Sequence, residues 1–256
     1  MRAAVQTTYG PPSVVSAVDD APRPTPGDGD LLVEVHATTV NRTDCGFRAA
    51  SPPIVRLFSG LRSPKHPTLG NEFAGAVVET GPSVTRFAVG DRVFGYIEGP
   101  FGGHAEYLVV DQDASIATIP PNVTDELAAA GNEGSHYALA FTTAGHFGPG
   151  TDVMVYGATG AIGSAAVQIA KHLGATVTAV CATDHLDLVT GLGADRVVDY
   201  TAGDFTQDEQ RYDVVLDAVG KSSWGACKQL LKPRGLYMSS ELGRFGQNPL
   251  LAIVTP

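Results

Sequence analysis

One stretch of this chain restricts its fold more than any other: a short apolar run that leads into three glycines at fixed spacing. Residues 153–156 are rich in β-forming side chains, and Gly157, Gly160 and Gly163 follow in the pattern G-x-x-G-x-x-G. In a strand-turn-helix unit the first glycine permits the tight turn, the second lets the backbone approach a pyrophosphate, and the third lets the helix pack closely on the strand. The N–H groups at the helix start then favour phosphate. The spacing alone is equally compatible with an ordinary helix-opening loop.

The residues after the glycines have the spacing of an amphipathic helix and favour the first interpretation. Apolar side chains recur at i, i+3, i+4, i+7, i+8 and i+11, at Ile162, Ala165, Ala166, Ile169, Ala170 and Leu173. Gly174 ends this predicted helix, and 176–180 reads as the next strand. The whole is a βαβ unit of about 30 residues, the length expected for a dinucleotide-binding motif.

Length, charge and cysteine content exclude several classes of protein. With 256 residues, of which 43% are hydrophobic, the chain can form two domains with real cores. Its formal net charge of −10 argues against a nucleic acid or an anionic membrane as partner, because both need clustered Lys and Arg. No uncharged apolar run reaches about 18 residues and the N-terminus has no apolar h-region, so a soluble, cytoplasmic protein is expected. Cys45, Cys181 and Cys227 lack C-x-x-C spacing and are expected to be free thiols.

The pattern changes near residue 125, which predicts two domains, 1–125 and 126–256. In the first, residues 31–38 have the two-residue period of a half-buried strand. Shorter β-like runs between turn residues follow, at 75–79, 91–94 and 105–110. The first half is therefore expected to be a compact, β-rich domain.

The second half alternates between strands and helices, which predicts a mostly parallel sheet with both faces covered. The expected strands are 153–157, 176–180, 196–199, 213–217 and 235–240. A doubly wound sheet of six strands needs one more. The sheet is therefore expected to lack its last strand.

Eight segments, in order along the chain, resemble motifs of a single family. Four lie in the first half, at 40–44 (V-N-R-T-D), 70–75 (G-N-E-F-A-G), 89–95 (V-G-D-R-V-F-G) and 102–108. Four lie in the second half, at 157–163, 192–200, 213–220 and 231–235. Together they resemble the medium-chain dehydrogenase/reductase superfamily and, within it, the zinc-independent quinone oxidoreductase-like branch. The resemblance implies a GroES-like β-barrel domain followed by a Rossmann domain. It also implies a homodimer, although a sheet without its last strand would leave an unpaired edge after Leu236.

The same comparison bears on a catalytic metal. Zinc members of the superfamily carry a Cys at the position that matches Asn41 and a His at the position that matches Asn71. An amide is a poor substitute for thiolate or imidazole as a zinc ligand, and Glu72 alone does not make a site. None of the seven histidines has H-x-x-H or H-E-x-x-H spacing, so each is expected to be a surface or packing residue. We predict no catalytic metal.

The end of the second strand bears on the choice of nicotinamide nucleotide. An acidic residue about 20 positions after the glycines would bind the ribose 2′-OH of NAD and repel a 2′-phosphate. Residues 179–183 are small or neutral, so NADPH is favoured over NADH. Thr183 and His185 could donate hydrogen bonds to a phosphate, whereas Asp184 has the wrong charge. Thr183 could equally well cap the next helix instead.

The resemblance places further residues around the cofactor, with Tyr200 beside the adenine, Val219 beside the ribose and Ser239 to Leu242 beside the nicotinamide. The full set of candidate cofactor-binding residues is Gly157, Ala158, Thr159, Gly160, Ala161, Ile162, Gly163, Cys181, Thr183, Tyr200, Val219, Ser239 and Leu242.

The expected chemistry is hydride transfer, which a nicotinamide supplies while the protein orients the reactants. Without a Lewis acid, quinones and α,β-unsaturated carbonyls are better hydride acceptors than simple ketones. Asn41 is the candidate for holding the nicotinamide or the substrate oxygen, and Thr43 and Asp44 complete the candidate catalytic set. The sequence is equally compatible with a structural role for Asp44, in a turn or as a helix cap. Many relatives have a tyrosine near this segment, but Phe47 cannot donate a proton, so water is expected to supply it.

Two other classes of enzyme fit the sequence less well, and one alternative without catalytic activity stays open. The chain has no G-x-S-x-G elbow, and none of its eight tyrosines is followed by lysine four positions later, which argues against an α/β-hydrolase and a short-chain reductase. A nucleotide-binding protein without turnover, in a sensing or structural role, is the alternative. The end at Pro256 favours it, because in the family the chain then returns to complete the catalytic domain.

Overall fold

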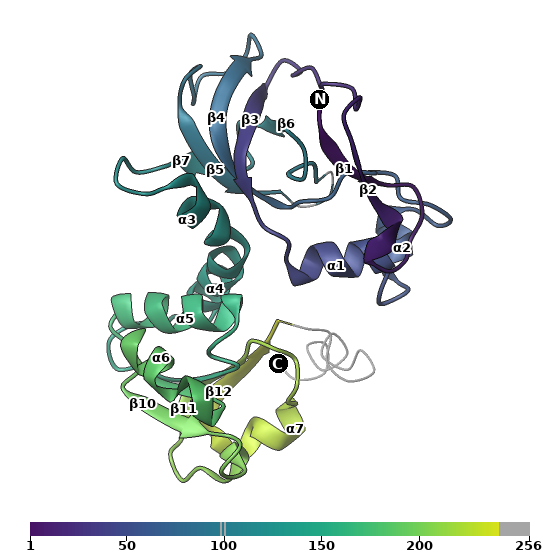
Figure 1. Ribbon diagram of the computed structural model, residues 1–256. Helices are drawn as coiled ribbons and strands as arrows, with labels where there is room; N and C mark the ends of the chain where they lie inside the picture. Colours follow the sequence, from purple (N-terminus) through teal and green to yellow (C-terminus); the bar gives the residue numbers. More distant parts are fainter. Residues whose placement is uncertain (98, 100, 241–256) are drawn as a thin grey trace. The chain divides into compact units, whose positions relative to one another are not determined.

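The structure, a computed structural model, describes residues 1–97, 99 and 101–240 (Figure 1). Contacts between Cα atoms divide the chain into two compact units that meet in sequence between Glu133 and Gly134. Each unit has its own sheet and its own hydrophobic core. In the part of the chain that is described, no helix is both long and apolar enough to cross a membrane.

The first unit is rich in β-strands, as the sequence predicts, and the strands pair antiparallel. A five-stranded sheet has the order β6-β3-β4-β5-β7, and β1 pairs with β2 in a separate hairpin. The strands are β1 (Ala3–Gln6), β2 (Val15–Val18), β3 (Asp30–Thr38), β4 (Glu72–Thr80), β5 (Arg92–Tyr96), β6 (Tyr107–Asp111) and β7 (Ser115–Thr118). A β-rich first unit agrees with the GroES-like domain that the resemblance implies.

Strand β3 follows its predicted alternation only in its second part. His36 and Thr38 are exposed, as expected for a half-buried strand, but Leu31, Leu32 and Val33 are all buried. The pairing register with β4 shifts between Leu32 and Val33. A shift of this kind breaks the regular two-residue period, which a sequence pattern cannot anticipate.

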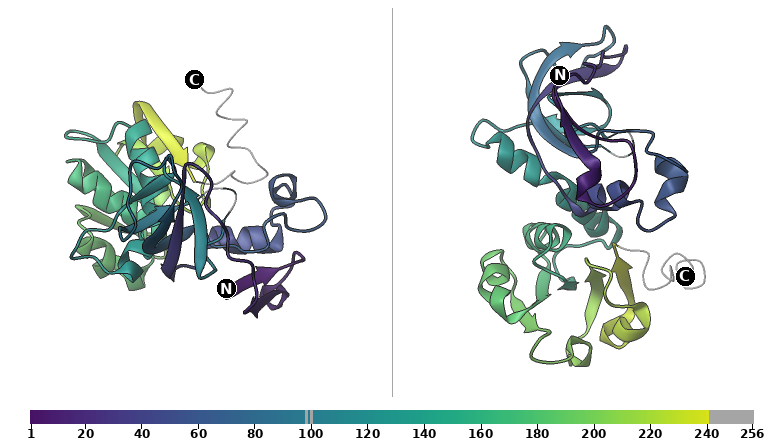
Figure 2. Two further views of the ribbon diagram at one scale, coloured as in Figure 1. Left: turned by 90° about the horizontal axis from the view of Figure 1, so that it is seen from above. Right: turned by 45° about the vertical axis from the view of Figure 1, so that its right-hand side comes forward.

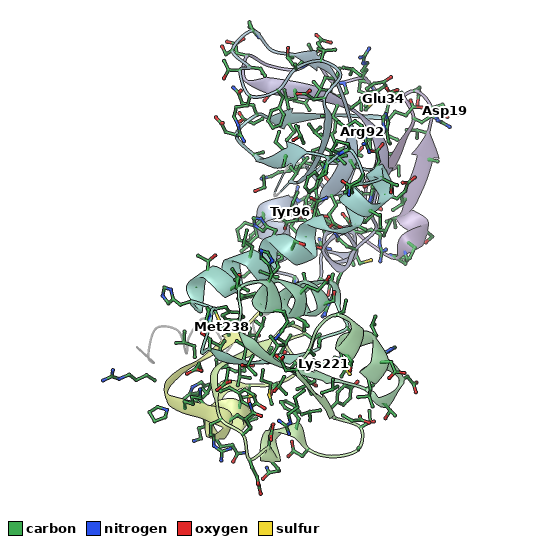
Figure 3. All side chains as sticks on the ribbon, turned by 90° about the vertical axis from the view of Figure 1, so that its left-hand side faces the viewer. Asp19, Glu34, Arg92, Tyr96, Lys221 and Met238 are labelled. Carbon is green, nitrogen blue, oxygen red and sulfur yellow. The ribbon has the colours of Figure 1, made fainter. Side chains whose placement is uncertain are left out.

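Short helices complete the first unit, and the sequence did not predict them. They are α1 (Arg42–Ala49), α2 (Val55–Ser59) and α3 (Asp125–Ala130). Arg92, labelled in Figure 3, reaches from β5 to the start of α3, where it donates to the Val123 carbonyl at 2.9 Å and, through Nε, to Asp125 at 3.1 Å. Asp125 also suits this place as an acidic residue in the first helical turn.

The second unit is a parallel five-stranded sheet in the order β10-β9-β8-β11-β12. Its strands are β8 (Asp152–Tyr156), β9 (Thr176–Cys181), β10 (Arg196–Asp199), β11 (Tyr212–Asp217) and β12 (Leu231–Ser239). Up to residue 240, where the described part of this unit ends, the five expected strands are present and parallel. Strand β12 begins four residues earlier than the expected 235, and its register with β11 shifts between Tyr212 and Val214.

Both faces of this sheet are covered, and alternate side chains of each strand enter different cores. Val153 and Val155 pack in one core with α5 (Ala161–His172) and α6 (Leu186–Gly191), whereas Met154 packs in the other with the segment around α7 (Trp224–Cys227). Figure 2 shows α5 and α6 on one side of the sheet and α7 on the other. Helix α4 (Asn132–Ala144) precedes β8. Burial on both faces explains why the strand sequences are almost continuously apolar.

A hydrogen-bonded cluster of polar side chains in this unit makes the stability of the unit depend on pH. Asp208 accepts hydrogen bonds from Arg196 at 3.0 Å and from the Tyr212 hydroxyl at 2.6 Å. Burial opposes ionisation of Asp208, but these hydrogen bonds outweigh it and lower the pKa of the carboxyl from 3.8 to about 2. The stabilisation is therefore fully present above the ordinary pKa and is lost as the pH falls through about 2.

We expect Asp208→Asn to lower the free energy of unfolding by about 1 kcal/mol at neutral pH. The difference from the unmodified chain should shrink steadily as the pH falls from about 5 towards 2. Urea denaturation across this range measures it, with the exposed Asp187→Asn as control. A difference that stays constant with pH would contradict the assignment.

Candidate functional site

The glycine turn has the geometry that the sequence predicts, and the backbone conformation and close contacts of the turn explain why glycine is needed there. Gly157 has φ +80°, a conformation that favours glycine. A Cβ on Gly157 would lie 2.5 Å from a methyl carbon of Val219, and a Cβ on Gly163 would lie 2.2 Å from the Gly157 carbonyl oxygen. Both positions therefore require glycine for the helix to pack against the turn.

Gly160 differs from the other two glycines. It is exposed and in extended backbone before α5, and a Cβ there would meet no atom closer than the Gly157 oxygen at 3.6 Å. No side chain caps the start of α5, and its first turn has no acidic residue. The turn thus leaves room for a ligand at a helix N-terminus, where backbone N–H groups favour phosphate.

The candidate cofactor residues gather at one edge of the sheet. Gly157, Cys181, Tyr200 and Val219 each follow or end a different strand, and parallel strands have their carboxyl ends at the same edge. The order of strands reverses between β8 and β11, so this edge includes the topological switch point at which open α/β sheets bind ligands. Ser239 ends β12 at the same edge. Leu242 lies outside the described residues.

The neighbours of Gly157 in the turn and helix differ in exposure. Ala158 is buried, Thr159 is half-buried, and Ala161 is exposed at the start of α5, while Ile162 packs on the core beneath the helix. Tyr200 is 44% exposed as a residue, and its ring lies edge-on to the ring of Tyr156, with centroids 6.0 Å apart. A ring exposed in this way can still stack against a planar ligand.

The end of the second strand differs from the sequence-based interpretation in two respects. Thr183 does not cap a helix, because its hydroxyl donates to Asp199 at 2.5 Å and lies 2.7 Å from that of Thr201. Asp199 is brought beside it by the pairing of β10 with β9, which places Asp199 opposite Cys181. Hydrogen bonds from Thr183 and Thr201 lower the pKa of Asp199. The Asp199 carboxylate, which belongs to the neighbouring strand, therefore lies beside Thr183, although the residues up to Thr183 are themselves small or neutral. Cys181 itself is buried, which raises the pKa of its thiol.

A buried carboxylate holds the loop that follows β11. Asp217 is fully buried and accepts hydrogen bonds from the backbone N–H groups of Val219 at 3.1 Å, Gly220 at 2.8 Å and Ser222 at 2.8 Å. The Tyr237 hydroxyl donates to its second oxygen at 3.0 Å, and burial together with the Asp217 charge raises the pKa of Tyr237. Asp217 thus fixes the segment that carries Val219.

In the first unit, the candidate catalytic residues lie at the start of α1. Asn41 is the N-cap of this helix, and its side chain accepts from the Asp44 N–H at 3.0 Å, while Asp44 accepts from the Asn41 N–H at 3.1 Å. The second oxygen of Asp44 accepts from the Gly70 N–H at 3.0 Å. The reading of Asp44 as a cap is therefore confirmed. Burial raises the pKa of its carboxyl despite these bonds.

The Asn41 amide also connects α1 to the start of β4. Its Nδ2 donates to Asn71 Oδ1 at 2.6 Å and to Glu72 at 3.1 Å. Glu72 is buried and also accepts from the Thr39 hydroxyl and, at 2.6 Å, from the Glu133 N–H. This donor set does not fit zinc, because Asn41 presents N–H groups to its neighbours and two amides replace the thiolate and imidazole that zinc prefers.

Three residues near this network were not singled out by the sequence. The Thr43 hydroxyl donates to Glu133, whose carboxyl has a pKa raised by burial and by the charges of Glu72 and Asp44. His104 Nε2 lies 2.7 Å from the Thr39 carbonyl oxygen and 3.7 Å from Asp44. Thr39, His104 and Glu133 come from three separate segments, so no local spacing could have revealed them.

A hollow of about 670 Å³ lies in the first unit and is lined in part by residues of α1. It is lined mainly by small apolar residues of the β1–β2 hairpin and β3, and it reaches Asp44 and His104. Thr43 and Glu133 are not in its lining. Its volume alone does not connect it to the chemistry of the network.

Replacing the cap tests how much of the network depends on Asn41. We expect Asn41→Ala to lower the free energy of unfolding by about 1–2 kcal/mol, because it removes the cap and both donations of the amide. Asn41→Ser keeps a capping oxygen and should lose less than half as much. Urea denaturation of the two variants measures the difference, and equal losses would show that capping contributes nothing.

Comparison with known families follows the two units. Residues 27–121 match the model of the alcohol dehydrogenase GroES-like domain, and residues 161–247 match the model described as zinc-binding dehydrogenase. Among solved structures, an alcohol dehydrogenase superfamily protein from Novosphingobium aromaticivorans superposes with a TM-score of 0.82 at 29% identity, covering 99% of this chain and 76% of that one. The quinone oxidoreductase of Pseudomonas syringae pv. Tomato DC3000 gives a TM-score of 0.78 at 28% identity, covering 97% and 78%.

Curated relatives agree with these matches. The NADPH-dependent alkenal/one oxidoreductase of Arabidopsis thaliana is 32% identical over 235 residues, which cover 86% of this chain and 58% of that protein. The 2-methylene-furan-3-one reductase of Solanum lycopersicum also has only 58% of its length covered. The quinone-oxidoreductase QR1 of Triphysaria versicolor is 30% identical over 251 residues, covering 92% of this chain and 73% of that protein. The chain thus belongs to the medium-chain dehydrogenase/reductase superfamily, among its quinone oxidoreductase-like members.

Proposed function

We propose that the protein is an NADPH-dependent oxidoreductase that transfers a hydride to a quinone or an α,β-unsaturated carbonyl compound. The observation that carries this proposal is the glycine turn at the switch point of the parallel sheet, with open space at Gly160 and an uncapped helix start. The names of two relatives, an NADPH-dependent alkenal/one oxidoreductase and a quinone-oxidoreductase, support the cofactor and the substrate class. Residues 1–125 would bind the substrate and residues from 126 on the nucleotide.

The residues present fit such a cofactor. Gly157 and Gly163 shape the turn, and Gly160 leaves the space that a Cβ would fill. The N–H groups at the start of α5 would bind phosphate, and the remaining candidates on β9 to β12, from Cys181 to Ser239, would line the nucleotide along the carboxyl edge. When bound, a reduced nicotinamide supplies a hydride. Thr183 would bind phosphate only after giving up its hydrogen bond to Asp199.

The substrate class follows from the donor set at the start of α1. We propose a zinc-free site, because the Asn41 amide nitrogen donates to Asn71 Oδ1 and to Glu72, so these side chains are hydrogen-bonded to one another rather than arranged as ligands. An acceptor that delocalises negative charge onto an oxygen suits a site without a Lewis acid. Thr43 would contact that oxygen, while Asn41 and Asp44 would hold α1 and Thr43 in place.

The test is oxidation of NADPH in the presence of a panel of quinones and enones, using the full chain. Turnover with at least one acceptor is expected. Measurable NADPH binding without turnover on any acceptor would favour the alternative, a nucleotide-binding protein in a sensing or structural role. Fluorescence titration should also show tighter binding of NADPH than of NADH, and equal affinities would contradict the choice of nucleotide.

A further inference from the structure

Glu133 occupies an unusual place in the hydrogen-bond network of the first unit. Its carboxylate accepts from the Thr43 hydroxyl, and its backbone N–H donates to Glu72 at 2.6 Å. The side chain is half-buried, so it remains accessible to water or to a small molecule. It is the first-turn acid of α4, whereas Thr43 lies in the first turn of α1.

The charges around Glu133 favour its protonated form. Glu72 from β4 and Asp44 from α1 are the charged neighbours that act on it, and both are acidic. Burial is the largest influence and also raises the pKa of Glu133, against the hydrogen bond from Thr43 and a smaller influence of the nearby Asn71 amide. A carboxyl group with a raised pKa keeps its proton to a higher pH than an ordinary glutamate, which suits a group that gives up a proton during a reaction.

An unpartnered donor lies beside this carboxyl group. Asn71 is 1% exposed, and its Nδ2 has no hydrogen-bond partner among the described residues, although the amide is close enough to Glu133 to favour the ionised form. A buried N–H group without a partner has lost its hydrogen bonds to water without compensation, which is unfavourable. A ligand oxygen placed between Asn71 and Thr43 would satisfy it.

We propose that Glu133 is the acid that supplies the proton consumed in the reduction, and that the Thr43 hydroxyl passes it to the substrate oxygen while Asn71 Nδ2 holds that oxygen. This inference rests on the proposed function and replaces the expectation that water protonates the substrate directly.

The other acidic groups are less suited to this role. Both oxygens of Asp44 accept backbone N–H groups, at Asn41 and Gly70. Both oxygens of Glu72 are likewise hydrogen-bonded, one to Glu133 N–H and the other to Thr39 and Asn41. Glu133 accepts through Oε1 from a hydroxyl, which can itself donate a proton onward.

The step balances in atoms and charge. The acceptor gains a hydride, that is, one proton with two electrons, from a reduced nicotinamide nucleotide. Negative charge then develops on the oxygen of the acceptor. The Thr43 O–H bond breaks as its proton moves to that oxygen, and Thr43 Oγ1 takes the proton of Glu133. Glu133 is left as a carboxylate, which water reprotonates before the next turnover.

The first test needs no cofactor. Infrared spectra of the unliganded protein, recorded across pH, should contain a carboxylic-acid band that titrates above the ordinary range for glutamate. Glu133→Gln should remove this band, whereas Glu126→Gln, a control at an exposed position on α3, should keep it. The same titration in all three proteins would overturn the assignment of the proton to Glu133.

The second test uses turnover with an acceptor that the protein reduces. Glu133→Gln should lower kcat by about 10²- to 10⁴-fold, the usual contribution of a general acid. In the unmodified protein kcat should fall as the pH rises through the pKa of Glu133, and this fall should be absent in Glu133→Gln. Thr43→Val should lower kcat similarly, and Thr43→Ser, which keeps the hydroxyl, should restore most of it.

The two proposals can fail separately. If no acceptor is reduced, the proposed function is wrong, whatever the infrared titration shows. If acceptors are reduced and Glu133→Gln keeps both the rate and the pH dependence of the unmodified protein, the function stands and the role of Glu133 is wrong.

Discussion

Gly163→Ala is expected to destabilise the second unit by about 1–3 kcal/mol and to remove nucleotide binding. The added methyl carbon would lie 2.2 Å from the Gly157 oxygen and 2.9 Å from the Ala158 Cα. Both are backbone atoms of the turn, so α5 has to move away from the end of β8. The same movement displaces the N–H groups that would bind phosphate. Urea denaturation and NADPH titration measure the two effects.

Gly191→Ala is the matched control for this change. Gly191 is the last residue of α6, and a Cβ there would meet no atom within 4 Å. Alanine reduces the freedom of the unfolded chain, so this variant should be unchanged or stabilised by up to about 1 kcal/mol. If both variants behave alike, the close approach of α5 to the turn is not what requires glycine at 163.

Asp217→Ala should cost about 3–5 kcal/mol of unfolding free energy, enough to unfold much of the second unit at 37 °C. Three backbone N–H groups and the Tyr237 hydroxyl would lose their acceptor in a buried place. The loop after β11 would lose its anchor, and Val219 would no longer be held against Gly157.

Two further variants separate charge from hydrogen bonding at this position. Asp217→Asn keeps the size of the side chain and one accepting oxygen, so it should retain part of the stability. Asp187→Ala, at an exposed position in the first turn of α6, should cost less than about 0.5 kcal/mol. Thermal unfolding followed by circular dichroism compares them. A loss at Asp217 no larger than that at Asp187 would contradict the anchoring role.

The parts of the fold that depend on local pattern were predictable from the sequence. The glycine turn, the helix after it and the five parallel strands follow from apolar spacing and from residues that interrupt it. Helix α1 was missed because Gly46 lies in its middle and its residues are mostly polar. Its stability comes instead from the capping box of Asn41 and Asp44 and from the contact of Asp44 with Gly70.

The candidate site was predictable only where its residues adjoin a motif. Asn41, Thr43 and Asp44 were found because they lie together in one segment that resembles the family. Glu133 is 90 positions from its partner Thr43, and Asp199 is 16 positions from Thr183. Such pairs arise from the pairing of strands and the packing of helices, which a single sequence does not specify. The acidic side chain of Asp199 beside Thr183 therefore could not be predicted from the residues around Thr183.

The three cysteines, spaced widely along the chain, have a practical consequence. Cys181 and Cys227 are buried, and burial raises the pKa of both thiols, so few of them are present as reactive thiolate. Cys45 is half-buried, in α1 and next to Asp44. A maleimide dye should therefore attach at one position without any mutagenesis. Its fluorescence would report on the surroundings of α1, and an unfolded chain would reveal itself by taking up three dyes instead of one.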